Sequence, residues 1–110
     1  NLLGHFESYK EISSIILAHQ EHYDGSGYPK GLAGEQIPII ARIIAIADAY
    51  HAMTSNRPYR RAMDPADAAQ ELIRKRGTQF DPRLVDAFVQ GLVRLRLVKL
   101  EDLQQKADIA

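Results

Sequence analysis

The chain has 110 residues, 45% of them hydrophobic and 25% charged, which suits one modest globular domain. Basic and acidic residues balance at 14 each, which excludes a bulk field that would draw nucleic acid or an anionic membrane. The absence of cysteine excludes disulfides, thiolate-bound zinc and a cysteine nucleophile, and it fits a reducing compartment, so we expect a cytoplasmic location. The longest apolar run, residues 37–47, is too short to span a bilayer.

The first half of the chain predicts two helices joined by a glycine-rich loop. Apolar residues at helical spacing predict a helix over residues 7–21. The string DGSG at residues 24–27 ends it, because glycine adopts backbone angles that helices do not use. A second helix is predicted over residues 38–54, beginning at a proline suited to a first turn. Its apolar arc is so wide that we expect a central, nearly buried helix.

The second half of the chain is punctuated by two Asp-Pro pairs, at residues 64–65 and 81–82. Each places an N-cap acceptor before a first-turn proline, and together they predict helices over residues 66–76 and from residue 82 through 92. We predict that residues 101–110 form a short tail. Because no strand pattern is evident, we expect the whole chain to form a single all-α domain, a helical bundle.

Two ionisable residues stand out against their apolar surroundings. Asp48 lies at the centre of the most apolar predicted helix, where a buried carboxylate must find a partner or take up a proton. Its chemistry favours a structural ion pair with arginine, and a metal ion and a solvent-facing position are the alternatives. His19, near the end of the first predicted helix, is either a capping or core group or a metal ligand. One imidazole and one carboxylate make half of a site for Fe, Mn or Zn.

Two further stretches carry residues suited to binding. The string DGSGYP consists of ordinary turn formers, yet Tyr28 offers an aromatic plane and the nearby amides suit an anion. Residues 57–61, Arg-Pro-Tyr-Arg-Arg, form a basic cluster that follows the long helix. This cluster is either a solvated helix end, where cations favour the helix dipole, or a phosphate clamp close to Asp48. Zero net charge and the lack of a basic helix face argue against a DNA-binding domain.

The string HQEHYDGSGYPKGLAGEQIPIIARIIAIADAYHAMTSNRPYRRAM, followed by GTQFDP, resembles the C-terminal half of HD-GYP domains. The resemblance covers roughly residues 12–90. HD-GYP domains are all-helical, metal-dependent bacterial phosphodiesterases of the HD superfamily that hydrolyse cyclic di-GMP. The resemblance therefore implies a partial HD-superfamily fold, signalling through cyclic di-GMP, and a divalent metal cofactor, Fe or Mn, with two or three ions in the intact domain. The implied products are pGpG and then GMP.

The resemblance also implies roles for individual residues. His19 and Asp48 match metal ligands of the family. The positions that match substrate-facing residues are the GYP signature and two basic residues: Gly27, Tyr28, Pro29, Arg57 and Arg60. His51 stands where the family usually has aspartate, one turn after Asp48, and is expected to replace that polar contact or to carry a proton.

Gln20 replaces the second histidine of the family's His-His-Glu, which removes one imidazole ligand. Because the family's defining His-Asp pair belongs upstream of the matched region, we expect this chain to be part of a longer protein that also carries a regulatory domain. The alternative function is a degenerate, non-catalytic module that binds cyclic di-GMP or a GGDEF-type partner. Missing helices would expose part of the apolar helix over residues 38–54, so the isolated chain should oligomerise or be only marginally folded.

Overall fold

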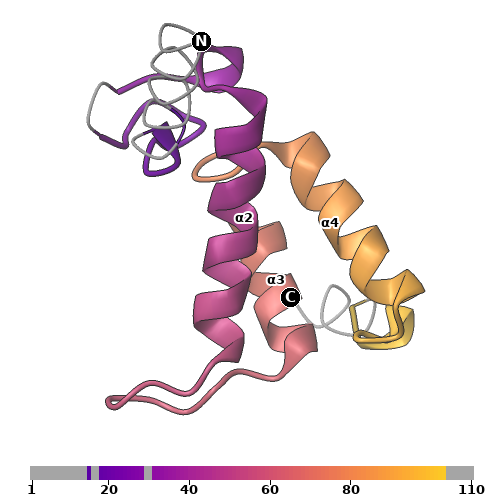
Figure 1. Cartoon of the computed structure of the whole chain (residues 1–110). Helices are drawn as coiled ribbons and strands as arrows, with labels where there is room; N and C mark the ends of the chain where they lie inside the picture. The colour runs from indigo at the N-terminus through magenta and orange to yellow at the C-terminus, as the bar shows by residue number, and fades with distance from the viewer. Residues whose placement is uncertain (1–14, 16–17, 29–30, 104–110) are drawn as a thin grey trace, which may run out of the picture.

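The computed structural model describes residues 15, 18–28 and 31–103, which form helices joined by loops (Figure 1). The elements are a short 3-10 helix and three α-helices: η1 (Gly34–Gln36), α2 (Ile39–Thr54), α3 (Pro65–Arg74) and α4 (Pro82–Arg94). The described residues contain isolated bridges but no strand, which confirms the all-α class. None of the helices in this part of the chain has the length and apolarity needed to cross a bilayer.

The Asp-Pro pairs begin α3 and α4 as the sequence predicts. Asp64 accepts a hydrogen bond from the Ala66 amide at 3.3 Å. Asp81 accepts hydrogen bonds from the amides of Arg83 at 2.9 Å and Leu84 at 3.4 Å. These carboxylates satisfy amides that have no partner within the helix, so local sequence fixes both helix starts.

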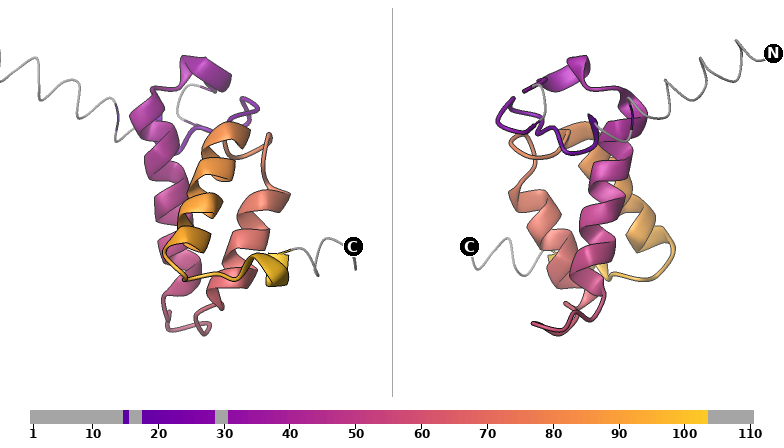
Figure 2. Two further views of the ribbon diagram at one scale, coloured as in Figure 1. Left: turned by 90° about the vertical axis from the view of Figure 1, so that its right-hand side faces the viewer. Right: turned by 60° about the vertical axis from the view of Figure 1, so that its left-hand side comes forward.

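The three α-helices pack against one another and enclose one core, as the two views in Figure 2 show. Its buried members come from all three helices and from the segments that follow α3 and α4: Ile46, Ala66, Ala69, Leu72, Phe80, Val85, Val89, Leu92, Val98 and Leu103. At the edge of this core the rings of Tyr50 and Phe88 meet edge to face, with centroids 5.3 Å apart. A smaller cluster of Ala18, Ile37 and Ala41 joins the glycine-rich loop to the beginning of α2.

The predicted helix over residues 38–54 is present as α2, but the expectation that it is nearly buried is wrong. Only Ala41 and Ile46 of α2 are buried. Four isoleucines at helical spacing are exposed: Ile39, Ile40, Ile43 and Ile44. The described residues cover only one side of α2, and its uncovered side is also apolar. Such an exposed apolar side is expected if further helices of the domain pack against it.

An ion pair ties α2 to the start of α4. Arg42 Nη1 donates to Asp81 Oδ2 at 2.6 Å, and both side chains are largely buried. Arg42 Nε also donates to the Ile37 carbonyl at 2.9 Å. Because Asp81 also caps α4, this one carboxylate links the small cluster near Ile37 to the main core.

Of the predicted helix over residues 7–21, the structure describes only the end, where residues 15 and 18 are helical. The chain turns at residues 19–20, so His19 lies just beyond the helix. Residues 100–103 form a further helical turn, and the rest of the predicted tail lies outside the described residues.

Candidate active site

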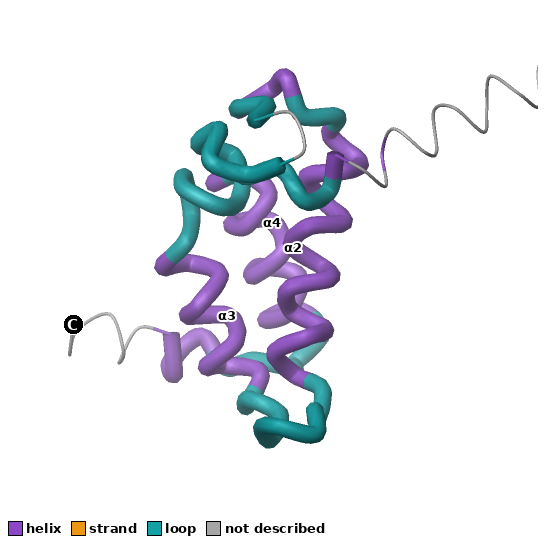
Figure 3. Tube along the Cα trace, turned by 90° about the vertical axis from the view of Figure 1, so that its left-hand side faces the viewer, coloured by secondary structure: helices purple, strands orange, loops and turns teal. Residues whose placement is uncertain are grey.

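The glycine-rich loop, described over residues 19–28 and 31–33, lies beside the turn that precedes α4 (Figure 3). The amide of Tyr23 donates to the Gln79 carbonyl at 3.1 Å, and the amide of Asp24 donates to the Thr78 carbonyl at 2.8 Å. The amide of Gly34 in turn donates to the Tyr23 carbonyl at 2.9 Å. Backbone hydrogen bonds between three distant segments therefore hold the loop in place.

Gly27, the first residue of the GYP signature, is required by close backbone packing. A Cβ atom at this position would lie 2.3 Å from the His22 nitrogen and 2.7 Å from the Gln20 carbonyl oxygen. Real Cβ atoms do not approach backbone atoms so closely, and the backbone cannot give way as a flexible side chain can. This crossing of the chain over itself directs the next residue, Tyr28, to the pocket described below.

The change Gly27→Ala is therefore expected to displace residues 20–22 and to lower the free energy of unfolding by about 1–3 kcal/mol, a typical cost of overpacking. The measurement is equilibrium denaturation of the intact protein. Gly91→Ala is the matched control, because Gly91 lies inside α4 and an added Cβ would have no atom within 4 Å apart from the adjacent residues and the surrounding helix backbone. Alanine favours helix at that position, so the control should be neutral or slightly stabilising. Equal stability of the two variants would contradict the prediction.

A short hydrogen-bonded turn stiffens the middle of the loop. Asp24 Oδ1 accepts from the Ser26 hydroxyl at 2.6 Å and from the Ser26 amide at 2.9 Å. The hydroxyl bond is the main cause that lowers the pKa of Asp24 below its ordinary value. The contribution of this turn to stability is accordingly present above the ordinary pKa of aspartate and is lost as the pH falls through the lowered value. His22 Nδ1 lies 3.2 Å from the same hydroxyl and extends the network.

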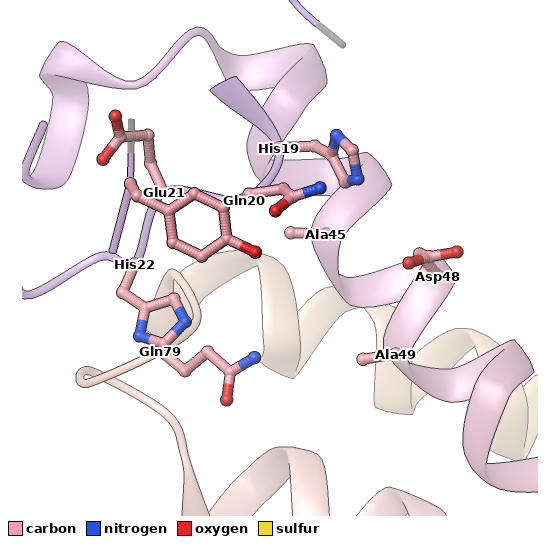
Figure 4. Close-up of a pocket in the computed structure, with 9 residues that line it drawn as sticks. His19, Gln20, Glu21, His22, Ala45, Asp48, Ala49 and Gln79 are labelled. Atoms are coloured by element: carbon pink, nitrogen blue, oxygen red, sulfur yellow. The ribbon is translucent and has the colours of Figure 1, made fainter. Parts of the chain in front are cut away.

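A pocket of about 280 Å³ opens between this loop and α2 (Figure 4). The loop, α2 and the turn before α4 all contribute lining residues: His19, Gln20, Glu21, His22, Tyr28, Ala45, Asp48, Ala49 and Gln79. Histidine, carboxylate, amide and phenol groups thus meet in one hollow. Such a mixture suits a polar ligand that carries charge and an aromatic or sugar ring.

The structure brings His19 and Asp48 into this same pocket, although 28 intervening residues separate them in the chain. Asp48 is exposed and forms no ion pair with any described residue. The structural ion pair with arginine that its apolar surroundings favoured is therefore not formed within the described residues, because Asp48 lies on the side of α2 that α3 and α4 leave uncovered. The solvent-facing and metal-binding alternatives are compatible with this position.

The two side chains supply an imidazole nitrogen and a carboxylate oxygen, a donor pair that suits Fe, Mn or Zn. Among the residues described, no group of three or more histidine, aspartate or glutamate side chains is placed to hold a metal ion. A cation bound between His19 and Asp48 would therefore need ligands from elsewhere in the protein. The donor types of the pair are those expected for half of a metal site.

Of the other predicted site residues, only some line the pocket. Tyr28 lines the pocket and is exposed, whereas Gly27, the residue before it, does not line the pocket. Pro29 lies outside the described residues. His51 is exposed on α2 one turn after Asp48 and does not line the pocket. His51 is therefore not part of this pocket, and its expected role as a polar contact or proton carrier stays a prediction.

The basic cluster lies at the opposite end of α2 from the glycine-rich loop (Figure 1). Arg57 and Arg60 exchange two backbone hydrogen bonds, of 2.9 and 3.2 Å, that close a tight turn. The Arg60 guanidinium donates to the carbonyls of Ala52 at 3.0 Å and Met53 at 3.5 Å, the last turn of α2. Arg60 thus binds the helix end, as the first of the two interpretations of this cluster predicts, whereas the Arg57 side chain is exposed.

Arg60→Ala is expected to destabilise the protein by about 1.5–3 kcal/mol, because it removes charge-assisted hydrogen bonds to partly buried carbonyls. Arg57→Ala, the matched control, should stay within about 0.5 kcal/mol, as exposed substitutions usually do. Chemical denaturation of both variants measures the difference. If Arg57→Ala loses as much stability as Arg60→Ala, the hydrogen bonds from Arg60 to α2 are not the cause of the loss.

The sequence did not single out Gln79, although it lines the pocket. It belongs to the matched string GTQFDP, but its place depends on the hydrogen bond between its carbonyl and Tyr23, a contact between segments far apart in the chain. Glu21 was likewise named only as part of the His-His-Glu match. Its burial is the one signal that could have drawn attention to it, and burial is not visible in sequence.

Comparison with known proteins identifies the family of the chain. The family model described as HD domain matches residues 1–84. The chain belongs to the HD domain family, and this confirms the family predicted from its sequence.

Its relatives are cyclic dinucleotide phosphodiesterases. The cyclic di-GMP phosphodiesterase response regulator RpfG of Xanthomonas campestris is 45% identical over 98 residues, which are 88% of this chain and 26% of the relative. The cyclic di-GMP phosphodiesterase PA4108 of Pseudomonas aeruginosa is 42% identical over 81 residues, 74% of this chain and 19% of the relative. The crystal structure of V-cGAP3, a cyclic GMP-AMP specific phosphodiesterase of Vibrio cholerae, superposes with a TM-score of 0.67 at 28% identity. That match covers 86% of this chain and 22% of the solved one, so the chain spans about a quarter or less of the length of these proteins.

Proposed function

We propose that the protein to which this chain belongs hydrolyses a phosphodiester bond of cyclic di-GMP and that this chain supplies part of the active site. One observation carries the proposal: His19 and Tyr28 of the glycine-rich loop and Asp48 of α2 line a single pocket. Membership of the HD domain family and the activities of the relatives support it. A cytoplasmic location agrees with the absence of cysteine.

In this proposal His19 and Asp48 are two of the ligands of a divalent cation, Fe or Mn, with two or three ions in the intact domain. Such ions lower the pKa of bound water and neutralise charge that develops at phosphorus. His19 and Asp48 hold their side of the site on two different segments, so the pocket keeps its shape only while the glycine-rich loop is docked on α2. The remaining ligands come from the upstream part of the domain.

The substrate is proposed to lie with one base or sugar against Tyr28 and to extend along the exposed side of α2. Thr54, the end of α2, is six positions after Asp48, a rise of about 9 Å, with His51 between them. This span brings Arg57, just beyond the helix, within reach of a phosphate or guanine edge. Arg60 would contribute by anchoring the turn that presents Arg57. The GYP signature, including Pro29, would form the opposite wall, and the products would be pGpG and GMP.

The proposal is tested by elemental analysis and a turnover assay on the full-length protein, with cyclic di-GMP and cyclic GMP-AMP as competing substrates. The expected result is bound Fe or Mn and preferential cleavage of cyclic di-GMP. Binding of cyclic di-GMP without metal or turnover would instead support the alternative, a non-catalytic module that acts through the nucleotide or a GGDEF-type partner. Gln20, which lines the pocket where the family has histidine, is the observation that keeps this alternative in the test.

A further inference from the structure

We propose that Glu21 is a positioning residue of the pocket: its buried carboxylate closes the base of the glycine-rich loop and so determines where Tyr28 lies. Its effect on substrate binding rests on the function proposed above, whereas its effect on the loop does not. Glu21 touches the pocket wall, but its role is to hold the loop.

Burial of Glu21 needs an explanation, because a carboxylate taken from water is costly unless hydrogen bonds compensate it. The residue is only 3% exposed, and among the described residues it shares the class of buried charged side chains with Asp81 alone. Glu21 Oε2 accepts a hydrogen bond from the Leu32 amide at 2.9 Å. The acceptor and the donor are eleven residues apart, so this bond spans the base of the loop that carries the GYP signature.

The donor of this hydrogen bond, Leu32, is itself held in place by packing. Its side chain packs against the cluster formed by Ala18, Ile37 and Ala41, which lies at the start of α2. The carboxylate of Glu21 therefore ties the glycine-rich loop to the helix that carries Asp48. Loss of the Glu21–Leu32 hydrogen bond would let the loop move relative to α2 and so change the width of the pocket between them.

The backbone of Glu21 performs a second task. Gly27 packs so closely on residues 20–22 that a Cβ atom would lie 2.8 Å from the Glu21 carbonyl carbon. The backbone at Glu21 is thus the surface on which Gly27 rests, while its side chain holds Leu32 on the far side of the loop. Tyr28 follows Gly27 directly and lines the pocket, so its position depends on both contacts.

Three substitutions in the full-length protein distinguish the effects of side-chain length, charge and hydrogen bonding at position 21. Glu21→Gln keeps an acceptor oxygen at the same reach, Glu21→Asp keeps the charge but is shorter, and Glu21→Ala removes both. Glu35→Ala is the matched control, because Glu35 is an exposed glutamate in η1. The readouts are amide hydrogen exchange at Leu32 and Tyr28, metal content, and kcat and KM for cyclic di-GMP.

The Asp and Ala variants are expected to exchange the Leu32 amide about tenfold faster or more and to raise KM by a similar factor, since a hydrogen bond to a charged acceptor is lost. Metal content and kcat at saturation should change little, and Glu21→Gln should restore both the exchange rate and KM. Unchanged exchange at Leu32 in Glu21→Ala would overturn the proposal, as would equal losses in the Gln variant or in Glu35→Ala. Faster exchange without a change in KM would overturn the link to Tyr28. If the unmodified protein does not cleave cyclic di-GMP, the proposed function fails, and exchange at Leu32 and Tyr28 still decides whether Glu21 holds the loop.

Discussion

Asp48→Asn in the intact protein is expected to lose bound metal and to lower kcat by at least about 100-fold. The amide keeps the size of the side chain but removes the anionic oxygen that a hard cation prefers. Changes to residues that merely support a metal ligand cost about 10–100-fold in affinity or activity, so loss of a ligand itself should cost at least the upper end of this range. Elemental analysis and initial rates at saturating cyclic di-GMP measure both effects.

The same substitution should leave the fold intact, which makes the result interpretable. Asp48 is exposed and forms no ion pair with a described residue, so the variant and the unmodified protein should have the same thermal midpoint when both are free of metal. Asp86→Asn, on the surface of α4, is a control for the chemical change and should retain metal and turnover. Full metal content and full activity in Asp48→Asn would contradict the assignment of Asp48 as a ligand.

Asp81→Ala is expected to have the largest effect on stability, a loss of about 3–5 kcal/mol. The change leaves the largely buried Arg42 guanidinium without its partner at 2.6 Å, and breaking a buried pair from one side costs about this much. It also removes the cap that accepts the amides of Arg83 and Leu84. Equilibrium unfolding in denaturant measures the loss, with the slope of the transition checked for two-state behaviour.

The chain offers a matched ion pair as the control. Arg76 Nη1 and Asp86 Oδ1 are also 2.6 Å apart, but both side chains are about half exposed, so Asp86→Ala should cost only about 0–1 kcal/mol. The contact distance is the same in the two pairs, so the difference between the variants reports the burial of the Arg42–Asp81 pair together with the helix cap that only Asp81 provides. Similar losses in the two variants would show that the Arg42–Asp81 pair does not hold α2 to α4.

Local sequence was sufficient for α2, α3 and α4 and for their starts, whereas η1 was not predicted. The Asp-Pro pairs predicted where α3 and α4 begin, because a carboxylate cap and a first-turn proline act within a few residues of the helix end. The same reasoning placed α2 within one residue of its observed start. The burial of α2 was predicted wrongly, since an apolar pattern shows which residues can be buried but not which neighbours are present to cover them.

The candidate site was predictable in part. The residues of the GYP signature and the pair His19 and Asp48 were identified by their spacing and by resemblance, and the structure places Tyr28 and this pair around one pocket. Arg60 was expected near the substrate, yet its guanidinium binds the end of α2. A sequence shows that a cation follows a helix, but it does not show whether that cation turns back to the helix carbonyls or outward to a ligand.

The amino-acid sequence by itself determined the family, the all-α class, the helix starts and the residue types available for metal and nucleotide binding. These properties depend on composition and on interactions between near neighbours. Only the tertiary structure decided that Glu21 is buried beneath the loop, that Gly27 has no room for a side chain, and that Gln79 lines the pocket beside Asp48. Each of these depends on how the backbone folds back on itself, over a few residues at Gly27 and over many residues at Gln79, and spacing along the chain does not encode such contacts.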